Sequence, residues 1–426
     1  MAPQRPEPLE RLLTDALAET PPGRSIWVAL SGGLDSSLLV HLASHVCRRV
    51  GRSLRAIHIH HGLQTAADGF EQHCQALCKS LDVPLTVVRV SVGSSDGGIE
   101  AAARQARYAA FYEHIPAGDC VWLAQHQDDQ AETLLLAALR GSGIRGLAGM
   151  PYRREAQGLY FIRPWLSVSR KHIEACAHAL ALRWCEDPTN RDLAIDRNRL
   201  RHAVIPSLEN RWPHASEALA QSAAHAGEAD ALLGEYAQAE LDTLRLSAEC
   251  IDAAALATRS RSRQRLLVRT LCQQQHLPTP PKRRLEALLE QLAASVDASV
   301  QVSWPGAEAR VWRKRLYIMA PLHPLPQWQH TWGGQPGLET PLGALELAVS
   351  TQTPLMLRWR QGGEVIALAG RGRRDVKRLL QEADIPPWER ERLIMVMRAN
   401  TCLGVIRPPD RVLWQAADIS ITRATT

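Results

Sequence analysis

Two periodicities alternate along the first half of the chain, and this alternation limits the possible folds more than any other feature of the sequence. Short stretches rich in β-branched residues predict strands, and stretches with apolar residues three or four apart predict helices. Strands that alternate with helices favour an α/β fold, in which a doubly wound parallel sheet has helices on both faces. The predicted strands are 25–30, 54–60, 85–90 and 120–125, and the predicted helices are 36–50, 66–81, 100–115 and 129–140.

Polar clusters follow three of the predicted strands. They read SGGLDS at 31–36, HHGLQ at 60–64 and HQDDQAET at 126–133. Parallel sheets bind ligands at the carboxyl ends of their strands, and neighbouring strands end at the same edge. The three clusters therefore predict a single site at that edge.

The first cluster has the properties of a phosphate-binding loop. Gly32 and Gly33 let backbone N–H groups turn toward an anion, while Ser31 and Ser36 add hydroxyl donors. The positive end of the helix that follows adds to the attraction. The loop has no lysine, so it is not the GxxxxGK[ST] loop of enzymes that transfer the γ-phosphate. Its one acid, Asp35, would suit a magnesium ion on the phosphates.

The rest of the chain divides into further domains. From about 215 the sequence is alanine-rich and helical, residues 300–321 alternate like a hairpin, and 321–337 is rich in proline and glycine. A unit of mixed short strands and helices ends the chain. The expected division is a catalytic domain at 1–214, a mostly helical central domain at 215–325, a linker at 326–350 and an α+β domain at 351–426.

Composition excludes several classes of protein. The formal net charge is +6, well below that of a histone-like tail. The nine cysteines are scattered without a CxxC pair, which argues against a disulfide framework and a zinc knuckle. The sequence has no secretory h-region and no apolar run of about 18 residues. We therefore expect a cytoplasmic protein with no membrane partner.

The phosphate loop resembles the PP-loop of ATP pyrophosphatases, which cleave ATP between the α- and β-phosphates. Four further motifs resemble tRNA(Ile)-lysidine synthetases: HIHHGLQ at 58–64, GIEAAARQARY at 98–108, the run 124–150 around DDQAET, and RWCEDPTN…RNRLRHAVIPSL at 183–208. A fifth, at 359–393, resembles the C-terminal motif of that family. The departures are His60 and Gln64, and Gln125, which stands where the family usually has a histidine.

The resemblance implies a reaction and its substrates. It implies that ATP adenylates the C2 oxygen of the wobble cytidine in a tRNA(Ile) with a CAU anticodon, and that L-lysine then displaces AMP. The partners are therefore tRNA(Ile) and L-lysine, with ATP as a substrate and Mg²⁺ as the metal, and a homodimer is left open.

The resemblance also assigns residues to the ATP and lysine sites. Asp129 and Glu132, three apart on one helical face, would hold the ammonium groups of lysine. On charge alone they could equally be acids that favour the helix dipole. From the residues themselves, Asp35 would hold magnesium together with Asp128 or, as the alternative, Asp129. The ATP site would consist of Ser31, Gly32, Gly33, Leu34, Asp35, Ser36 and His58.

Arginines supply the remaining expected site residues. Arg104 would stabilise charge on the adenylated intermediate. Arg197 and Arg201 are four residues apart, and we expect them to face the transferring nucleotide or the anticodon-loop phosphates. The expected catalytic set is thus Asp35, Arg104, Asp129, Glu132 and Arg197. Arg201, Arg371, Arg373, Arg374 and Lys377 are expected to bind tRNA, although a solvated surface is the common explanation for such basic runs.

Other functions fit less well. A tRNA thiolase would need the absent CxxC cysteines, and an asparagine synthetase would need an N-terminal cysteine, whereas the first here is Cys47. A non-catalytic RNA-binding protein would have no reason to keep SGGLDS and DDQAET intact. His58, His60, His61 and His126 lack the spacing of a zinc site.

Overall fold

The structure, a computed structural model, describes residues 7–62, 67–91, 98–292 and 300–423. Gln64 and the expected start of a helix at residue 66 lie outside the described residues. The chain divides into two compact units, Met1–Tyr236 and Ala237–Thr426. Among the described residues, no helix combines the length and apolar character needed to cross a membrane.

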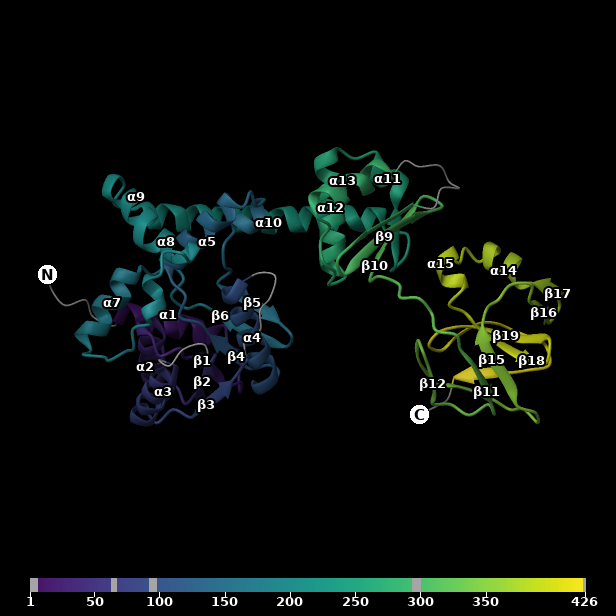
Figure 1. Cartoon of the computed structure of the whole chain (residues 1–426), viewed down its shortest axis with the longest axis horizontal. Coiled ribbons are helices and arrows are strands. Elements are labelled where there is room, and N and C mark those ends of the chain that lie inside the picture. Colours follow the sequence, from purple (N-terminus) through teal and green to yellow (C-terminus); the bar gives the residue numbers. More distant parts are fainter. Residues whose placement is uncertain (1–6, 63–66, 92–97, 293–299, 424–426) are drawn as a thin grey trace. The chain divides into compact units, whose positions relative to one another are not determined.

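The first unit is built on a six-stranded sheet with the order β3-β2-β1-β4-β6-β5 (Figure 1). All neighbours pair in parallel except β5, which runs antiparallel to β6 at the edge. The predicted parallel α/β sheet is confirmed, and β5 and β6 extend it beyond the four strands read from the sequence. The strands are β1 (Ile26–Ala29), β2 (Leu54–His60), β3 (Leu85–Arg89), β4 (Cys120–Trp122), β5 (Arg153–Ala156) and β6 (Leu159–Ile162).

Helices cover both faces of this sheet, because its strands are apolar on both sides. On one face, α1 (Glu7–Ala18), α2 (Leu34–Arg49), α3 (Ala67–Leu81) and α7 (Arg170–Ala179) share one buried core with β1 and β4. On the other face, α4 (Gly98–His114) packs Phe111 against the sheet.

Of the remaining helices, one begins after β4 at the carboxyl edge of the sheet, a short one comes next, and the others follow the last strand. They are α5 (Gln127–Leu139), α6 (Ile144–Leu147), the 3-10 helix η1 (Pro188–Arg191), α8 (Asp196–Arg199), the π-helix η2 (Leu200–Val204), α9 (Ile205–Arg211) and α10 (Ala215–Leu244). The division between the two units falls inside α10, and not at the expected residue 214.

The second unit begins with a small α+β region. Its four-stranded antiparallel sheet has the order β7-β10-β9-β8, and the expected hairpin is formed by β8 and β9. The strands are β7 (Cys250–Asp252), β8 (Val300–Trp304), β9 (Ala307–Trp312) and β10 (Arg315–Met319), and the helices are α11 (Ala253–Ala257), α12 (Arg261–Gln274) and α13 (Lys282–Glu290). The central part of the chain therefore contains a sheet as well as the expected helices.

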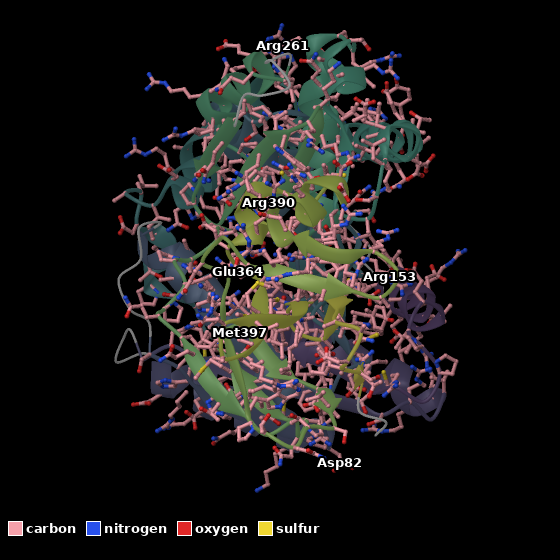
Figure 2. The ribbon with its side chains drawn as sticks, turned by 90° about the vertical axis from the view of Figure 1, so that its right-hand side faces the viewer. Asp82, Arg153, Arg261, Glu364, Arg390 and Met397 are labelled. Atoms are coloured by element: carbon pink, nitrogen blue, oxygen red, sulfur yellow. The ribbon has the colours of Figure 1, made fainter. Side chains whose placement is uncertain are left out.

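The end of the chain forms a mixed seven-stranded sheet with its own core (Figure 2, where Glu364 and Met397 are labelled). Its strands are β11 (Gln329–Trp332), β15 (Leu355–Trp359), β16 (Val365–Leu368), β17 (Gly372–Asp375), β18 (Ile394–Arg398), β19 (Thr401–Arg407) and β20 (Arg411–Gln415), and its helices are α14 (Val376–Glu382) and α15 (Pro387–Arg390).

Residues 326–350, expected as a linker, are largely built into this last region. β11 pairs with β15, β12 (Leu338–Thr340) pairs with β13 (Gly343–Leu345), and β14 (Leu347–Val349) pairs with β21 (Ile421–Arg423). Trp332, Leu345, Leu347 and Val349 are buried in the core of the region. The prolines and glycines of this segment thus mark turns between short strands, and the structure corrects the linker expectation.

Candidate active site

The loop between β1 and α2 folds back on itself through its serines. The Ser31 and Ser36 hydroxyl groups are 2.9 Å apart, and the Ser31 N–H donates to the Ser36 hydroxyl over 3.1 Å. The helix begins at Leu34, two residues earlier than expected, with Gly33 as its N-cap. The loop therefore brings two hydroxyl groups to a helix N-terminus, as a phosphate site requires.

Gly32 is needed in this loop for its backbone and for its lack of a side chain. Its φ is +89°, a conformation that glycine adopts at little cost. A Cβ atom would lie 3.1 Å from Phe70 Cδ1 and 3.2 Å from Cys74 Sγ, both in α3. Any larger residue would therefore push the loop away from α3.

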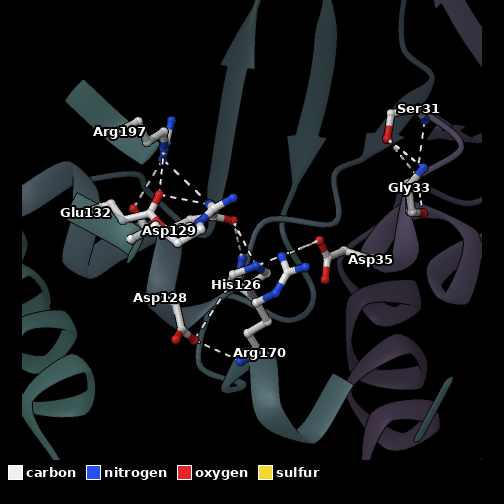
Figure 3. A network of polar contacts seen from close by, with 11 residues as sticks. Ser31, Gly33, Asp35, His126, Asp128, Asp129, Glu132, Arg170 and Arg197 are labelled. Atoms are coloured by element: carbon white, nitrogen blue, oxygen red, sulfur yellow. Dashed lines mark hydrogen bonds and ion pairs between the residues drawn. The ribbon is translucent and has the colours of Figure 1, made fainter. Parts of the chain in front are cut away.

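His126 joins the phosphate loop to the acidic cluster at the start of α5 (Figure 3). It is buried, and its Nε2 lies 3.5 Å from Asp129 Oδ2 and 3.9 Å from Asp35 Oδ2. Its Nδ1 lies 3.7 Å from Asp128 Oδ2. The Asp129 carboxylate also accepts the His126 backbone N–H over 3.1 Å, which caps α5. One histidine thus contacts three carboxylates from two strand ends.

Two arginines bind the carboxylates of α5. Arg197 Nε donates to Glu132 Oε2 over 2.7 Å, and Arg201 Nε donates to Glu132 Oε1 over 2.6 Å. Arg201 Nη2 also reaches Asp129 Oδ1 at 3.2 Å. Glu132 is fully buried, so its charge needs such partners. Arg197 and Arg201 lie on one face, as their spacing predicts. On that face both contact carboxylates of α5 in the same unit.

The pKa values of Asp129 and Asp35 are shifted in opposite directions. Burial raises the pKa of Asp129, but His126, Arg197 and Arg201 outweigh burial and leave that pKa below its usual value. For Asp35 burial wins: its pKa is raised, although His126 and Arg170 oppose the shift. Asp35 is thus short of positive charge compared with Asp129.

Asp35 fits a magnesium ligand better than Asp128 does. Asp35 Oδ1 is buried without a hydrogen-bond partner among the described residues, and an unpaired carboxylate oxygen is what a hard cation would take. Asp128 Oδ2 already accepts the Arg170 backbone N–H over 2.8 Å. Arg170 binds one oxygen of each aspartate, and the buried, unpaired Oδ1 makes Asp35 the principal candidate.

Arg170 is a site residue that the sequence analysis did not select. It is the first residue of α7, which Ser169 caps, and its Nη1 donates to Asp35 Oδ2 over 3.3 Å. In the sequence, Ser169 before a helical run predicts that a helix starts here. It does not predict that Arg170 contacts Asp35, which lies 135 residues away in the sequence. Only the packing of α7 beside α2 brings the two together.

Two other expected residues lie outside this network. His58 is buried below the loop, where its Nδ1 lies 2.8 Å from the Leu30 carbonyl oxygen. Burial lowers the pKa of His58, which favours the neutral ring. Arg104 is exposed on α4, with its guanidinium 5.0 Å from the centre of the Tyr108 ring.

Known families match the chain in three places. A PP-loop domain matches residues 6–208, a TilS substrate binding domain matches 251–317, and a TilS substrate C-terminal domain matches 355–407. A tRNA(Ile)-lysidine synthase from Xanthomonas axonopodis pv. citri is 43% identical over 92% of this chain and 92% of its own length. The chain belongs to the tRNA(Ile)-lysidine synthase family. Another member, from Pseudomonas aeruginosa, is 41% identical over 94% of each chain.

Membership of the tRNA(Ile)-lysidine synthase family makes the chain a ligase with an ATP-using PP-loop domain. The loop and the acidic network described above lie inside the PP-loop match. The basic run lies inside the C-terminal match, from the residue before β17 to the start of α14, and its members Arg371, Arg373, Arg374 and Lys377 are all exposed. Each region to which site residues were assigned thus lies inside a matched family domain.

Proposed function

We propose that this chain joins L-lysine to C2 of the wobble cytidine in the CAU anticodon of tRNA(Ile). In the first step the cytosine C2 oxygen attacks the α-phosphorus of ATP, and pyrophosphate leaves. In the second step the lysine ε-nitrogen attacks C2, the C2–O bond breaks, AMP leaves and the nitrogen loses a proton. The product is lysidine, which pairs with A, so that the tRNA changes from methionine to isoleucine specificity. ATP and tRNA are both cytoplasmic, and the proposal includes that location.

One observation carries this proposal: His126 lies within 4 Å of both Asp35, in the phosphate loop, and Asp129, in the acidic cluster. A ligase of this kind must activate one substrate with ATP and hold an amine beside it. The two sets of residues that such a reaction needs, a phosphate loop and paired buried carboxylates, are neighbours in one unit.

The residues of the first step are those around the loop. Ser31, the Gly32–Gly33 backbone, Leu34 and Ser36 would hold the phosphates, with His58 supporting the loop from below. Asp35, with a smaller share for Asp128, would hold Mg²⁺. When bound, Mg²⁺ neutralises charge on the phosphates. Arg104 would stabilise charge on the adenylated cytidine.

The second step would use Asp129 and Glu132 for the lysine ammonium groups, with Arg197 in the catalytic set. The network now balances two arginines against two carboxylates. A lysine ammonium would therefore compete with a guanidinium for these oxygens, and a displaced Arg201 could turn to a tRNA phosphate. A carboxylate freed in this way could take the proton of the attacking amine, whose free pKa is about 10.4.

Replacing Asp35 tests the first step. We expect Asp35→Asn to abolish pyrophosphate release and to leave tRNA binding nearly intact, because the exposed basic residues lie elsewhere in the chain. Asp82→Asn is a matched control, since Asp82 is exposed in the turn before β3 and asparagine tolerates its φ of +54°. Pyrophosphate release near the wild-type rate in Asp35→Asn would rule out the role given to Asp35.

The overall reaction is tested by label transfer. The full chain is incubated with ATP, radiolabelled lysine and tRNA transcripts that differ in the anticodon. We expect label to enter only the transcript of tRNA(Ile) with a CAU anticodon. Label in no transcript, with active ATP hydrolysis, would overturn the proposed function.

A further inference from the structure

The phosphate loop between β1 and α2 offers an anion only neutral donors. Ser31 and Ser36 supply hydroxyl groups, and the first N–H groups of α2 have no carbonyl oxygen within the helix to bind. The one charged residue of the loop, Asp35, is an acid. Where a phosphate loop contains a lysine, that lysine reaches the β- and γ-phosphates of the nucleotide. The present loop leaves this position open for a cation from another part of the fold.

Arg170 brings a cation to this loop from the start of α7. Its Nη1 donates to Asp35 Oδ2 over 3.3 Å, and Asp35 is the second residue of α2 (Figure 3). The guanidinium therefore lies beside the first turn of α2, the turn whose free N–H groups would hold a phosphate. Helices α7 and α2 share one buried core on the same face of the sheet.

The backbone at the start of α7 is fixed by hydrogen bonds to the start of α5. The Arg170 N–H donates to Asp128 Oδ2 over 2.8 Å. The Gln127 N–H donates to the Val168 carbonyl oxygen over 2.9 Å. The Ser169 side chain caps α7. The point from which the Arg170 side chain extends toward the loop is therefore set by the fold.

The Arg170 guanidinium itself is held more loosely. Its side chain is 36% exposed, and it contacts Asp35 through Nη1 at 3.3 Å. By contrast, Arg197 and Arg201 bind the fully buried Glu132 at 2.7 and 2.6 Å. A partly exposed ion pair contributes little to stability, so a stronger partner can replace it at small cost. A phosphate is such a partner, because its oxygens accept two parallel N–H bonds from a guanidinium.

We propose that Arg170 is a phosphate-binding residue of this site, and that it supplies to the β- and γ-phosphates of ATP the cation that the loop lacks. This inference rests on the proposed function for ATP as the substrate. When the cytosine C2 oxygen attacks the α-phosphorus, the bond from that phosphorus to the bridging oxygen breaks, and its electron pair stays on the departing pyrophosphate. Arg170 stabilises this charge without giving up a proton, since a guanidinium stays protonated in proteins.

The experiment must separate this role from a simpler one, because Arg170 also neutralises Asp35. Removing the guanidinium leaves the Asp35 carboxylate without its cation, and that carboxylate would itself repel ATP. Arg170→Gln is therefore made both in the wild type and in an Asp35→Asn background, where there is no charge to neutralise. Binding is measured with Mg²⁺ removed by a chelator, so that loss of a metal ligand does not affect the result.

We expect Arg170→Gln to weaken ATP binding at least about tenfold in both backgrounds, because the lost bonds join two charged groups. Asp35→Asn alone should bind ATP at least as tightly as the wild type, since it releases Arg170 from its present partner. Arg170→Lys should lie between wild type and Arg170→Gln, because lysine keeps the charge but lacks the planar fork. AMP has no β- or γ-phosphate, so its binding should stay near the wild-type value in every Arg170 variant.

Lys171→Gln is the matched control. It removes the same charge one residue away, but the Lys171 side chain is 83% exposed and its Nζ lies 3.4 Å from Glu209 Oε2. Its effect on ATP binding should stay below about twofold, as for an exposed charge. Thermal unfolding of every variant shows whether its fold is intact.

The measurement is calorimetric titration of ATP, and separately of AMP, into the full chain without tRNA or lysine. If stable Arg170→Gln matches Lys171→Gln, or weakens ATP binding only while Asp35 is present, the inference is overturned. Equal losses of ATP and AMP binding would also overturn it, because the contact would then not involve the β- and γ-phosphates. Neither titration needs ligation, so Arg170 is still tested if the wild-type protein binds ATP but labels no tRNA and the proposed function falls.

Discussion

At the scale of single residues, the acidic cluster of α5 is defined by its partners. Glu132 is fully buried, yet both of its oxygens are used by guanidinium groups. Each such hydrogen bond to a charged group contributes about 1.5–3 kcal/mol. Glu132 is therefore a structural anchor as well as the proposed lysine ligand, and a substitution must separate the two roles.

We expect Glu132→Gln to spare ATP binding, to raise the lysine concentration needed for labelling, and to destabilise the chain by about 1.5–3 kcal/mol. The variant leaves two arginines facing one carboxylate, Asp129. The measurements are a lysine titration at saturating ATP and thermal unfolding.

The double variant Glu132→Gln/Arg201→Gln is the control for stability. It restores the balance of charge, and we expect it to regain most of the lost stability while the lysine requirement stays high. A lysine requirement that returns to normal together with stability would make Glu132 a purely structural residue.

At the scale of elements, the turn between β15 and β16 depends on one buried carboxylate. Glu364 Oε1 accepts from the Gln361 N–H at 2.8 Å and from Arg358 Nη1 at 3.0 Å, and Oε2 accepts from the Gly362 N–H at 3.0 Å. Burial raises the pKa of Glu364, but these donors outweigh burial and hold the pKa below its usual value. The turn is thus stabilised by the ionised form.

A lowered pKa sets the sign of the pH dependence. The unfolded chain binds the proton more readily than the folded chain, so Glu364 stabilises the fold above its unfolded pKa of about 4.3. That stability is lost as the pH falls through the folded pKa. We expect Glu364→Gln to speed hydrogen exchange in β15 and β16 at pH 7, and the difference from wild type to shrink as the pH falls below about 4.3.

Exchange is followed by mass spectrometry on the full chain, with Glu339→Gln as the control. Glu339 is exposed on β12, so its replacement should change little. A difference that persists undiminished at low pH would mean that the Glu364 charge does not stabilise this turn.

At the scale of the whole molecule, the exposed basic run is the feature to test against tRNA. We expect replacement of Arg371, Arg373, Arg374 and Lys377 by alanine to weaken tRNA binding and flatten its dependence on salt. Each lost phosphate contact removes about 0.7 to 0.9 from the slope of log K against log salt, so four contacts change it by about 3. Adenylation at saturating tRNA should persist, because the phosphate loop belongs to the other unit.

Filter binding across a series of salt concentrations measures this slope, with Asp35→Asn as a catalytic control that should keep the wild-type slope. If the four side chains are only a solvated face, affinity and slope will both stay at wild-type values. That result would remove the basic run from the tRNA-binding surface.

The sequence by itself determined the features that depend on near neighbours. Strand–helix alternation predicted the parallel sheet, because each period reflects burial of one local face. The glycines of SGGLDS predicted the loop, and Gly32 does have a positive φ. The four-residue spacing of Arg197 and Arg201 predicted their shared face.

Only the tertiary structure decided which distant groups meet. Arg197 and Arg201 reach Glu132 across 65 and 69 residues, and Arg163 reaches Gln125 across 38. In the same way β11 and β14 enter the C-terminal region by pairing with β15 and β21, where the local pattern suggested a linker. Periodicity records whether a residue is buried but not what buries it. The partners of Glu132, Asp35 and Gln125 are therefore set by the packing of whole helices and strands.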